Sequence, residues 1–409
     1  MAYEVLARFA EGLAVPPERM GLSWWGPDGK WYWPPGAYPG GTDGRYYGPP
    51  GTYPGEVTVT DAQGAEEMLR RKFEHLLALA AAAAVGGPVP GVGELTSDLP
   101  APGLPEDVPF RIGTSDIAVL RGHRENLRTL ARTHGGQARA AVALTDWADH
   151  WLTADASDLT RCALRAELAE LHTITAWCCH DRGAPVRALY HFGRAVELAT
   201  DAGDAYQAAY ALRHAAMMLV ERERPDDALK AVQLGGVRLL DAPRDDPRVP
   251  VLQSWCHVVS ALALSRLDDA GSVRAQARRE LAQSRDGWAP AHAHARADMD
   301  LITALTWLHC GQLDAAESAV TASAQTFGHS GDRREGVVAD LTRARLHVMS
   351  GDAGALSLAV SAIKATTQTR SGVARQVWLP PLVEALEARR GSDYADLART
   401  ARQVATTRV

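Results

Sequence analysis

The residues best suited to bind a ligand form a regular series near the middle of the chain. Tyr206, Tyr210, Arg213 and Met217 follow one another at i, i+4, i+7 and i+11, which places them on one face of a helix. Aromatic rings beside an arginine can hold a peptide carboxylate or a planar anionic ligand through a bidentate guanidinium contact. The alternative is structural: the tyrosines pack between helices, and Arg213 pairs with a glutamate.

Further candidates lie on helices that would stand beside this one. Stacked helix pairs present the first helix of each pair to a concave groove, so neighbouring pairs contribute to one surface. Trp177 and His180 belong to the preceding pair, and Asp298 and Arg345 to later ones. The predicted groove residues are Trp177, His180, Tyr206, Tyr210, Arg213, Asp298 and Arg345.

Metal binding receives little support from the sequence. Cys178, Cys179 and His180 are adjacent, so on a helix they point about 100° apart and cannot all face one ion. We expect these cysteines to be buried and structural. His292 and His294 are expected on different sides of a helix, although Asp298 lies four residues after His294 and could join it at a metal.

Catalytic motifs are also missing from the sequence. It contains no phosphate loop, no metalloprotease signature and no nucleophile elbow. We therefore predict no metal, no cofactor, no catalytic residue and no enzymatic activity.

The elements that would position the groove residues are helices joined by regularly spaced turns. After Gly113, apolar residues recur at helical spacing, and the turns lie at Gly183, Glu223, about Asp268, Gly311, Gly351 and Gly391. Separations of about 40 to 45 residues between helix–turn–helix units indicate a solenoid. Two earlier helices are expected at 114–133 and 137–153. The sequence predicts an all-α fold, a right-handed α-solenoid of residues 114–409.

The spacing of small and large residues within a unit indicates the repeat type. After Gly183, Ala188, Phe192 and Ala195 follow at +5, +9 and +12, which is the tetratricopeptide pattern. Small alanines allow close approach of antiparallel helices, and Phe192 fills the space against the next unit. The same positions hold Ala228, Val232 and Gly235; Ala316, Val320 and Ser323; and Leu356, Val360 and Ile363.

The residues before Gly113 have a different composition, because they include 15 of the 23 prolines. We expect a short helical segment at 1–22, an irregular Trp/Tyr/Pro/Gly-rich segment at 23–61, a helix at 62–87 and a linker at 88–113. The second segment contains a duplication, in which residues 31–40 are echoed by residues 46–55. Its nine aromatic residues predict packing on the protein or on a partner.

Together these features resemble actinobacterial regulators that combine an N-terminal Cro-type (xenobiotic-response element family) helix-turn-helix with C-terminal tetratricopeptide repeats. The resemblance covers nearly the whole chain, and it is carried by residues 3–22, 70–73, 111–116 and 188–235. Residues 3–22 are similar to the closing helices of that DNA-binding domain. The resemblance implies an array that binds a peptide, protein or small ligand and relays its state to an N-terminal module.

DNA binding is not expected from residues 1–409 alone. The family's three earlier helices, including the one that enters the major groove, are not found before residue 3. Either the start has been placed too late, or DNA binding has been lost. Residues 1–110 carry 7 Lys+Arg and 14 Asp+Glu, a net charge of −7, which disfavours phosphate binding. The alternative function is a free-standing interaction or scaffold protein.

Partners and location follow from composition and from the lack of export features. Five cysteines give no disulfide framework, and no N-terminal signal or membrane span is evident, so we expect a cytoplasmic protein. The expected partner is a peptide, protein or small molecule in the groove, with no membrane partner. DNA is expected only if an upstream helix-turn-helix is restored, and a homodimer is compatible with the sequence.

Overall fold

The computed structural model describes residues 24–25, 31–32, 109–267, 271–285, 288 and 292–407. The chain forms two compact units, residues 1–76 and 77–409. The predictions for residues 1–22, for most of segment 23–61, for the helix at 62–87 and for the linker up to residue 108 lie outside the described residues.

The first unit is described at two short strands, β1 (Trp24–Trp25) and β2 (Trp31–Tyr32), which pair antiparallel. An irregular backbone was predicted for this Gly/Pro-rich segment, so the pairing of β1 with β2 differs from the prediction at these four residues. Its physical basis is that Trp and Tyr favour extended strands, and the intervening sequence contains the turn-forming residues Gly, Pro and Asp.

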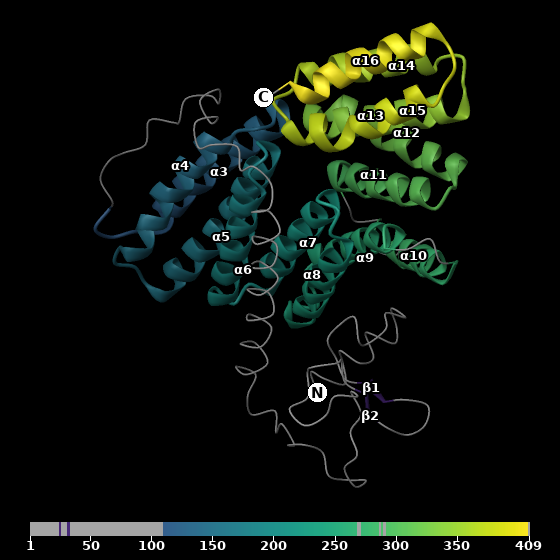
Figure 1. Ribbon diagram of the computed structural model, residues 1–409. Helices are drawn as coiled ribbons and strands as arrows, with labels where there is room; N and C mark the ends of the chain where they lie inside the picture. The colour runs from purple at the N-terminus through teal and green to yellow at the C-terminus, as the bar shows by residue number, and fades with distance from the viewer. Residues whose placement is uncertain are drawn as a thin grey trace. The chain divides into compact units, whose positions relative to one another are not determined.

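The described part of the second unit is an all-α, solenoid-like array of packed helix pairs (Figure 1). The α-helices are α3 (Thr114–His134), α4 (Ala138–Asp149), α5 (Asp158–Asp181), α6 (Pro185–Asp201), α7 (Ala205–Glu221), α8 (Pro225–Arg238), α9 (Arg248–Ser265), α10 (Gly271–Ser284), α11 (Ala293–His309), α12 (Leu313–Ser330), α13 (Arg333–Ser350), α14 (Ala355–Thr367), α15 (Pro380–Glu387) and α16 (Ser392–Thr406). Two 3₁₀ turns, η3 (His150–Thr153) and η4 (Leu239–Asp241), follow α4 and α8, and a π-helical turn, η6 (Ala374–Trp378), precedes α15. Across the described residues, no helix combines the length and apolarity needed to cross a membrane.

The predicted turns within the described residues each separate two helices. Gly183, Gly311 and Gly351 adopt left-handed φ values of 76°, 73° and 81°, which glycine reaches without a steric penalty. Glu223 takes the equivalent place between α7 and α8 with φ of 57°. Gly391 separates α15 from α16. The turn predicted near residue 268 falls between α9 and α10, outside the described residues.

The core between paired helices is built from the small and large apolar residues that the spacing identified. Ala188, Phe192 and Ala195 on α6 are all fully buried, as are Ala316 and Val320 on α12. Alanine at these positions brings the helix backbones close together, and the larger side chains fill the remaining space.

The prediction for the last of these repeats was right for Ile363, which is buried, and wrong for Val360, which is 52% exposed. Besides Ile363, α14 buries Ala355, Ala359 and Ala362. The difference arises because α14 begins four residues after its turn glycine, Gly351, whereas α6 and α12 begin two residues after theirs. The longer turn changes which face of the helix is buried.

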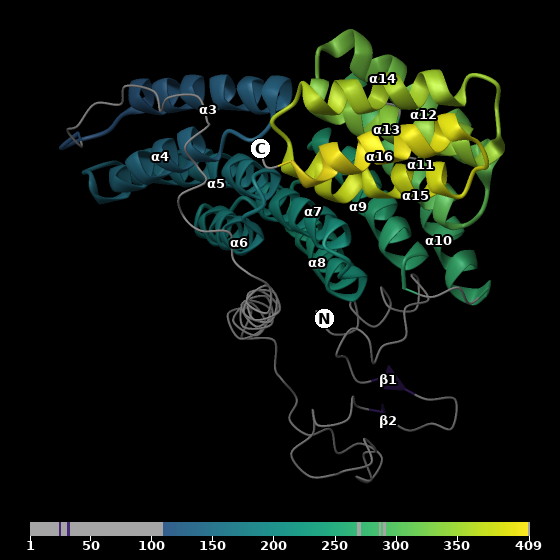
Figure 2. The same ribbon diagram turned by 45° about the horizontal axis from the view of Figure 1, so that its top comes forward.

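The array closes on itself, because α3 and α5 contact α13 and the segment that leads into η6 (Figure 2). The carboxylate of Asp181, at the end of α5, accepts hydrogen bonds from the backbone N–H of Gly136, from Arg334 on α13 and from Ser371. The backbone N–H of Arg370 donates to the carbonyl of His134 at 2.8 Å. We call these interactions the closing contact.

Backbone proximity at the closing contact requires glycine. A Cβ at Gly136 would lie 2.3 Å from the carbonyl oxygen of Arg370, and a Cβ at Gly372 would lie 2.7 Å from the carbonyl oxygen of Asp181. Helices distant in the sequence are therefore held together at close range, and the concave side of the array becomes partly enclosed.

Candidate functional site: a central cavity

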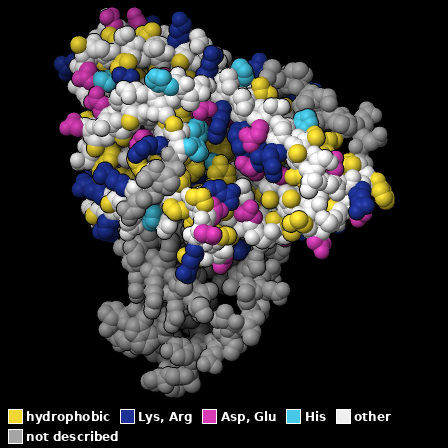
Figure 3. All heavy atoms as spheres, turned by 180° about the vertical axis from the view of Figure 1, so that it is seen from behind, with side chains coloured by type: hydrophobic (Ala, Val, Ile, Leu, Met, Phe, Trp, Pro, Cys, Tyr) yellow, Lys and Arg dark blue, Asp and Glu magenta, His cyan; other side chains and the backbone are white. Residues whose placement is uncertain are grey.

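The concave side of the array contains a cavity of about 380 Å³, which we call the central cavity. Its helical lining comes from α3, α5, α7, α9, α11, α13 and η6. These α-helices are the first members of their pairs, which agrees with the prediction that first helices face the concave side. Figure 3 shows basic (Lys or Arg), acidic and histidine side chains gathered around a depression that is floored by hydrophobic ones.

The series predicted on α7 lines this cavity with all four of its members, Tyr206, Tyr210, Arg213 and Met217. The rings of Tyr206 and Tyr210 are nearly parallel, with centroids 6.2 Å apart. Burial and the neighbouring Tyr210 raise the pKa of Tyr206 to about 12, so its hydroxyl remains a hydrogen-bond donor at neutral pH. The guanidinium of Arg248 lies over the Tyr206 ring at 4.3 Å.

Arg213 is held by protein groups. It is only 2% exposed, and its Nη2 donates to Asp298 of α11 at 2.5 Å. Its guanidinium lies 4.2 Å from the ring centroid of Trp255 on α9, a cation–π geometry. The alternative raised for Arg213, an internal carboxylate partner, is therefore what the structure contains, with an aspartate in place of a glutamate.

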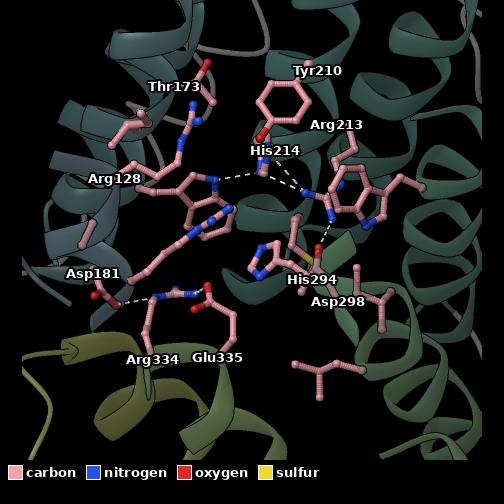
Figure 4. A pocket seen from close by; sticks show the side chains of 18 of the residues that line it. Arg128, Thr173, Asp181, Tyr210, Arg213, His214, His294, Asp298, Arg334 and Glu335 are labelled. Atoms are coloured by element: carbon pink, nitrogen blue, oxygen red, sulfur yellow. Dashed lines mark hydrogen bonds and ion pairs between the residues drawn. The ribbon is translucent and has the colours of Figure 1, made fainter. Parts of the chain in front are cut away.

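His214 connects α7 to α5 inside the cavity (Figure 4). Trp177 Nε1 donates to His214 Nδ1 at 2.8 Å, and Arg213 Nη1 lies 3.0 Å from the same nitrogen. Two donors directed at Nδ1 require an unprotonated nitrogen there, which assigns the proton of the neutral ring to Nε2. Burial, followed by the charges of Arg213, Arg128, Arg132 and His294, lowers the pKa of His214 well below its ordinary value.

Arg334 of α13 joins the cavity wall to the closing contact. Its Nε donates to Asp181 at 3.3 Å, its Nη1 donates to Glu335 at 2.8 Å, and its guanidinium lies 5.2 Å from the ring centroid of Trp177. Burial opposes the charge of Arg334, but Asp181 and Glu335 outweigh burial and raise its pKa. Arg334 therefore stays cationic and ties α13 to α5.

Five of the seven predicted groove residues line the central cavity: Trp177, Tyr206, Tyr210, Arg213 and Asp298. The other two do not line it. His180 is buried between α5 and α7, where its Nε2 bonds Glu221 at 2.7 Å. Arg345 lies seven residues after Val338, the last cavity residue on α13, which is about 10 Å further along the helix.

The prediction for His292 and His294 was also wrong, because both side chains line the cavity, with ring centroids 6.2 Å apart. His292 is the N-cap of α11 and has extended backbone angles, so helical spacing does not govern its direction. The pairing considered between His294 and Asp298 does not form. His294 Nδ1 bonds Asp332 at 2.7 Å, while Asp298 bonds Arg213.

Cys178 and Cys179 were expected to be buried in the core. Cys178 and Cys179 are buried, and the five cysteines, all within the described residues, form no disulfide. Among those residues, no group of three or more His, Cys, Asp or Glu side chains is arranged to hold a metal ion.

Several cavity residues were missed by the sequence analysis, notably Arg128 and Arg132 on α3, Trp255 on α9 and Arg334 on α13. Arg128 and Arg132 are four residues apart on a predicted helix, so applying the first-helix rule to residues 114–133 would have identified them. Trp378 could not be found this way, because η6 reaches the cavity only through the closing contact.

Comparison with known proteins does not assign the chain to a family, because no protein-family model matches it and no curated protein matches its sequence. The chemical character of the cavity is therefore the guide to function. A cavity of this size, enclosed by aromatic and charged groups from several helices, suits a small molecule or the end of a peptide.

Proposed function

We propose that the central cavity binds a small ligand and that the repeat domain reports this binding, as part of a protein of the transcriptional-regulator type. The supporting observation is that six first helices, from α3 to α13, contribute side chains to one cavity. A ligand there would contact repeats that are far apart in the sequence, so its binding energy would favour one arrangement of the array.

A small ligand is favoured over a long peptide by the closing contact. An extended peptide needs a groove that is open along its length, whereas here Asp181, Arg334 and Ser371 join the two ends of the concave side. The regulator assignment and the tetratricopeptide assignment rest on sequence resemblance. The alternative function is a scaffold protein that binds another protein and does not respond to a small molecule.

Native mass spectrometry can test this proposal. The purified chain would be incubated with the small-molecule fraction and, separately, with the protein fraction of a bacterial extract. We expect a defined mass increase from the first fraction that disappears in a Tyr206→Ala, Tyr210→Ala double variant. Tyr190→Ala is the matched control, because Tyr190 is 62% exposed on α6 outside the cavity lining. Binding of a protein alone, unaffected by the double variant, would support the scaffold alternative.

A further inference from the structure

The charged side chains that line the central cavity differ in how closely they are paired with other protein groups. Its carboxylates, among the described residues, all hold partners with positive charge or a histidine: Glu170 with Arg128, Asp181 with Arg334, Glu221 with His180, Asp298 with Arg213, and Glu335 with Arg334. A cationic ligand would have to compete with these partners. The acidic groups are therefore poor candidates for the primary ligand contact.

Arg132 on α3 is less closely paired than these carboxylates are. Within the described part of the chain its one ion-pair partner is Asp332, at 3.9 Å, and its side chain is 40% exposed. The Nε of Arg132 faces Oδ1 of Asp332 beyond hydrogen-bond distance, while the other oxygen of this carboxylate, Oδ2, accepts hydrogen bonds from His294 Nδ1 at 2.7 Å and from Ser330 Oγ at 3.1 Å. A guanidinium with a distant, shared partner retains most of its hydrogen-bonding capacity for a ligand.

Arg132 is one of several cationic groups whose charges act on His214. The strongest charges acting on His214 are those of Arg213, Arg128, Arg132 and His294, all of them cationic or able to become so. His214 itself is neutral, because two donors point at its Nδ1. The charges of Arg128 and Arg213 are balanced by Glu170 and Asp298, whereas Arg132 has its carboxylate partner at 3.9 Å. A guanidinium of this kind at the wall of a partly buried cavity attracts an anion more strongly than it would in water.

Aromatic side chains line the same cavity as Arg132. Trp177, Tyr206, Tyr210, Trp255 and Trp378 line the cavity together with the His214 ring. Ring faces provide a surface for a planar ligand body, and the protonated hydroxyl of Tyr206 can donate to a ligand oxygen. The cavity thus combines the guanidinium of Arg132 with an aromatic wall.

We infer that the central cavity binds a small aromatic oxyanion, with its carboxylate or phosphate contacting Arg132 and its ring lying among the aromatic side chains. This inference rests on the proposed function and names the ligand class. The sequence analysis placed the anion contact at Arg213, but Arg213 has an internal partner. Arg132 has N–H donors that remain available to a ligand. A guanidinium can contact two ligand oxygens with parallel N–H groups.

Isothermal titration calorimetry with matched probes tests this inference. Indole-3-propionate, indole-3-glycerol phosphate and tryptamine share one ring system and carry a carboxylate, a phosphate and an ammonium group respectively. We expect at least one anionic probe to bind, and tryptamine to bind at least about tenfold more weakly, because its ammonium would meet the guanidinium of Arg132 in place of an anion. The tighter of the two anions identifies the oxyanion.

Variants of α3 identify the contact residue. Arg132→Gln should weaken binding of the anionic probe by roughly tenfold to a hundredfold, which corresponds to loss of a hydrogen bond to a charged group. Arg132→Lys should restore part of this loss, since it keeps the charge but not the planar fork. Arg121→Gln is the matched control on the same helix, outside the cavity lining, and should bind as the parent does. Circular dichroism would verify that each variant folds.

Two results would overturn the inference without refuting the proposed function. One is tryptamine equalling the anionic probes in affinity, and the other is Arg132→Gln binding them as tightly as Arg121→Gln does. The cavity would then bind small molecules by another chemistry. Failure of every probe to bind would also overturn the aromatic-oxyanion class, while the mass increase with cell extract tests the proposed function separately.

Discussion

The helix interfaces and the central cavity of the second unit are built from different residues and depend on different contacts. The interface around α6 uses Ala188, Phe192 and Ala195, which are buried where adjacent helices pack. The cavity uses large polar and aromatic residues whose partners are distant in the sequence, as in the pair of Arg213 with Asp298. The interface therefore stabilises each helix pair locally, whereas the cavity ties separate pairs together and presents groups to a ligand.

Removing a large interface side chain should have the greatest effect on stability. Phe192→Ala should lower the free energy of unfolding by about 3–5 kcal/mol, because it leaves a cavity in a fully buried site. Tyr190→Ala, two residues away on the exposed side of α6, should change it by less than about 0.5 kcal/mol. Chemical denaturation measures both values. Equal losses in the two variants would contradict the assignment of the interface.

Removing the charge of Arg213 tests whether the cavity also contributes to stability. Arg213→Met leaves Asp298 without its partner and should cost about 2–3 kcal/mol, below the full value for a buried pair because Asp298 is partly exposed. Adding Asp298→Leu should recover part of that loss. A double-mutant cycle by chemical denaturation gives the coupling energy, and a value near zero would argue against a structural role for the pair.

His172 on α5 and His191 on α6 are buried with their Nδ1 atoms 3.0 Å apart, and this pair should make the interface sensitive to acid. Burial, together with the charges of His172 and Arg187, lowers the pKa of His191 to about 3. The folded state thus favours neutral His191, and this stabilisation is present above about pH 6.5 and is lost as the pH falls towards about 3. His191→Gln should reduce the loss of stability between about pH 6.5 and about pH 5 by about 2 kcal/mol. Urea denaturation across this range measures the slope, and an unchanged slope would refute the role of His191.

A smaller effect of opposite sign is expected at Asp300 on α11. Asp300 lines a second hollow, of about 500 Å³, between α10, α11 and α12, and burial raises its pKa to about 6. Its carboxylate is therefore disfavoured in the folded state, and stability falls as the pH rises from about 4 to about 6. Asp300→Asn should stabilise the protein by about 1 kcal/mol at neutral pH, after allowance for solvent screening, and should have no such effect below about pH 4. Thermal unfolding at both pH values tests this, and a gain that persists in acid would contradict it.

The helical array was predicted from the sequence more accurately than the contents of the site were. Turn residues such as Gly183 and Gly351 were found because left-handed backbone angles favour glycine. The series on α7 was found because helical spacing alone places its residues on one face. His292 was misplaced because it is a cap residue, and Val360 was misplaced because the turn after Gly351 is longer than expected.

Helical periodicity and the turn residues were enough to identify the helix pairs and their turns, because these features depend on residues a few positions apart. The stacking of helix pairs in a solenoid then indicated that the first helix of each pair faces the concave side. The meeting of α3 and α5 with α13, which brings Arg132, His294 and Trp378 to one cavity, became evident from the folded chain alone. Such contacts join residues far apart in the sequence through backbone proximity and ion pairing, and periodicity along a single helix carries no information about either.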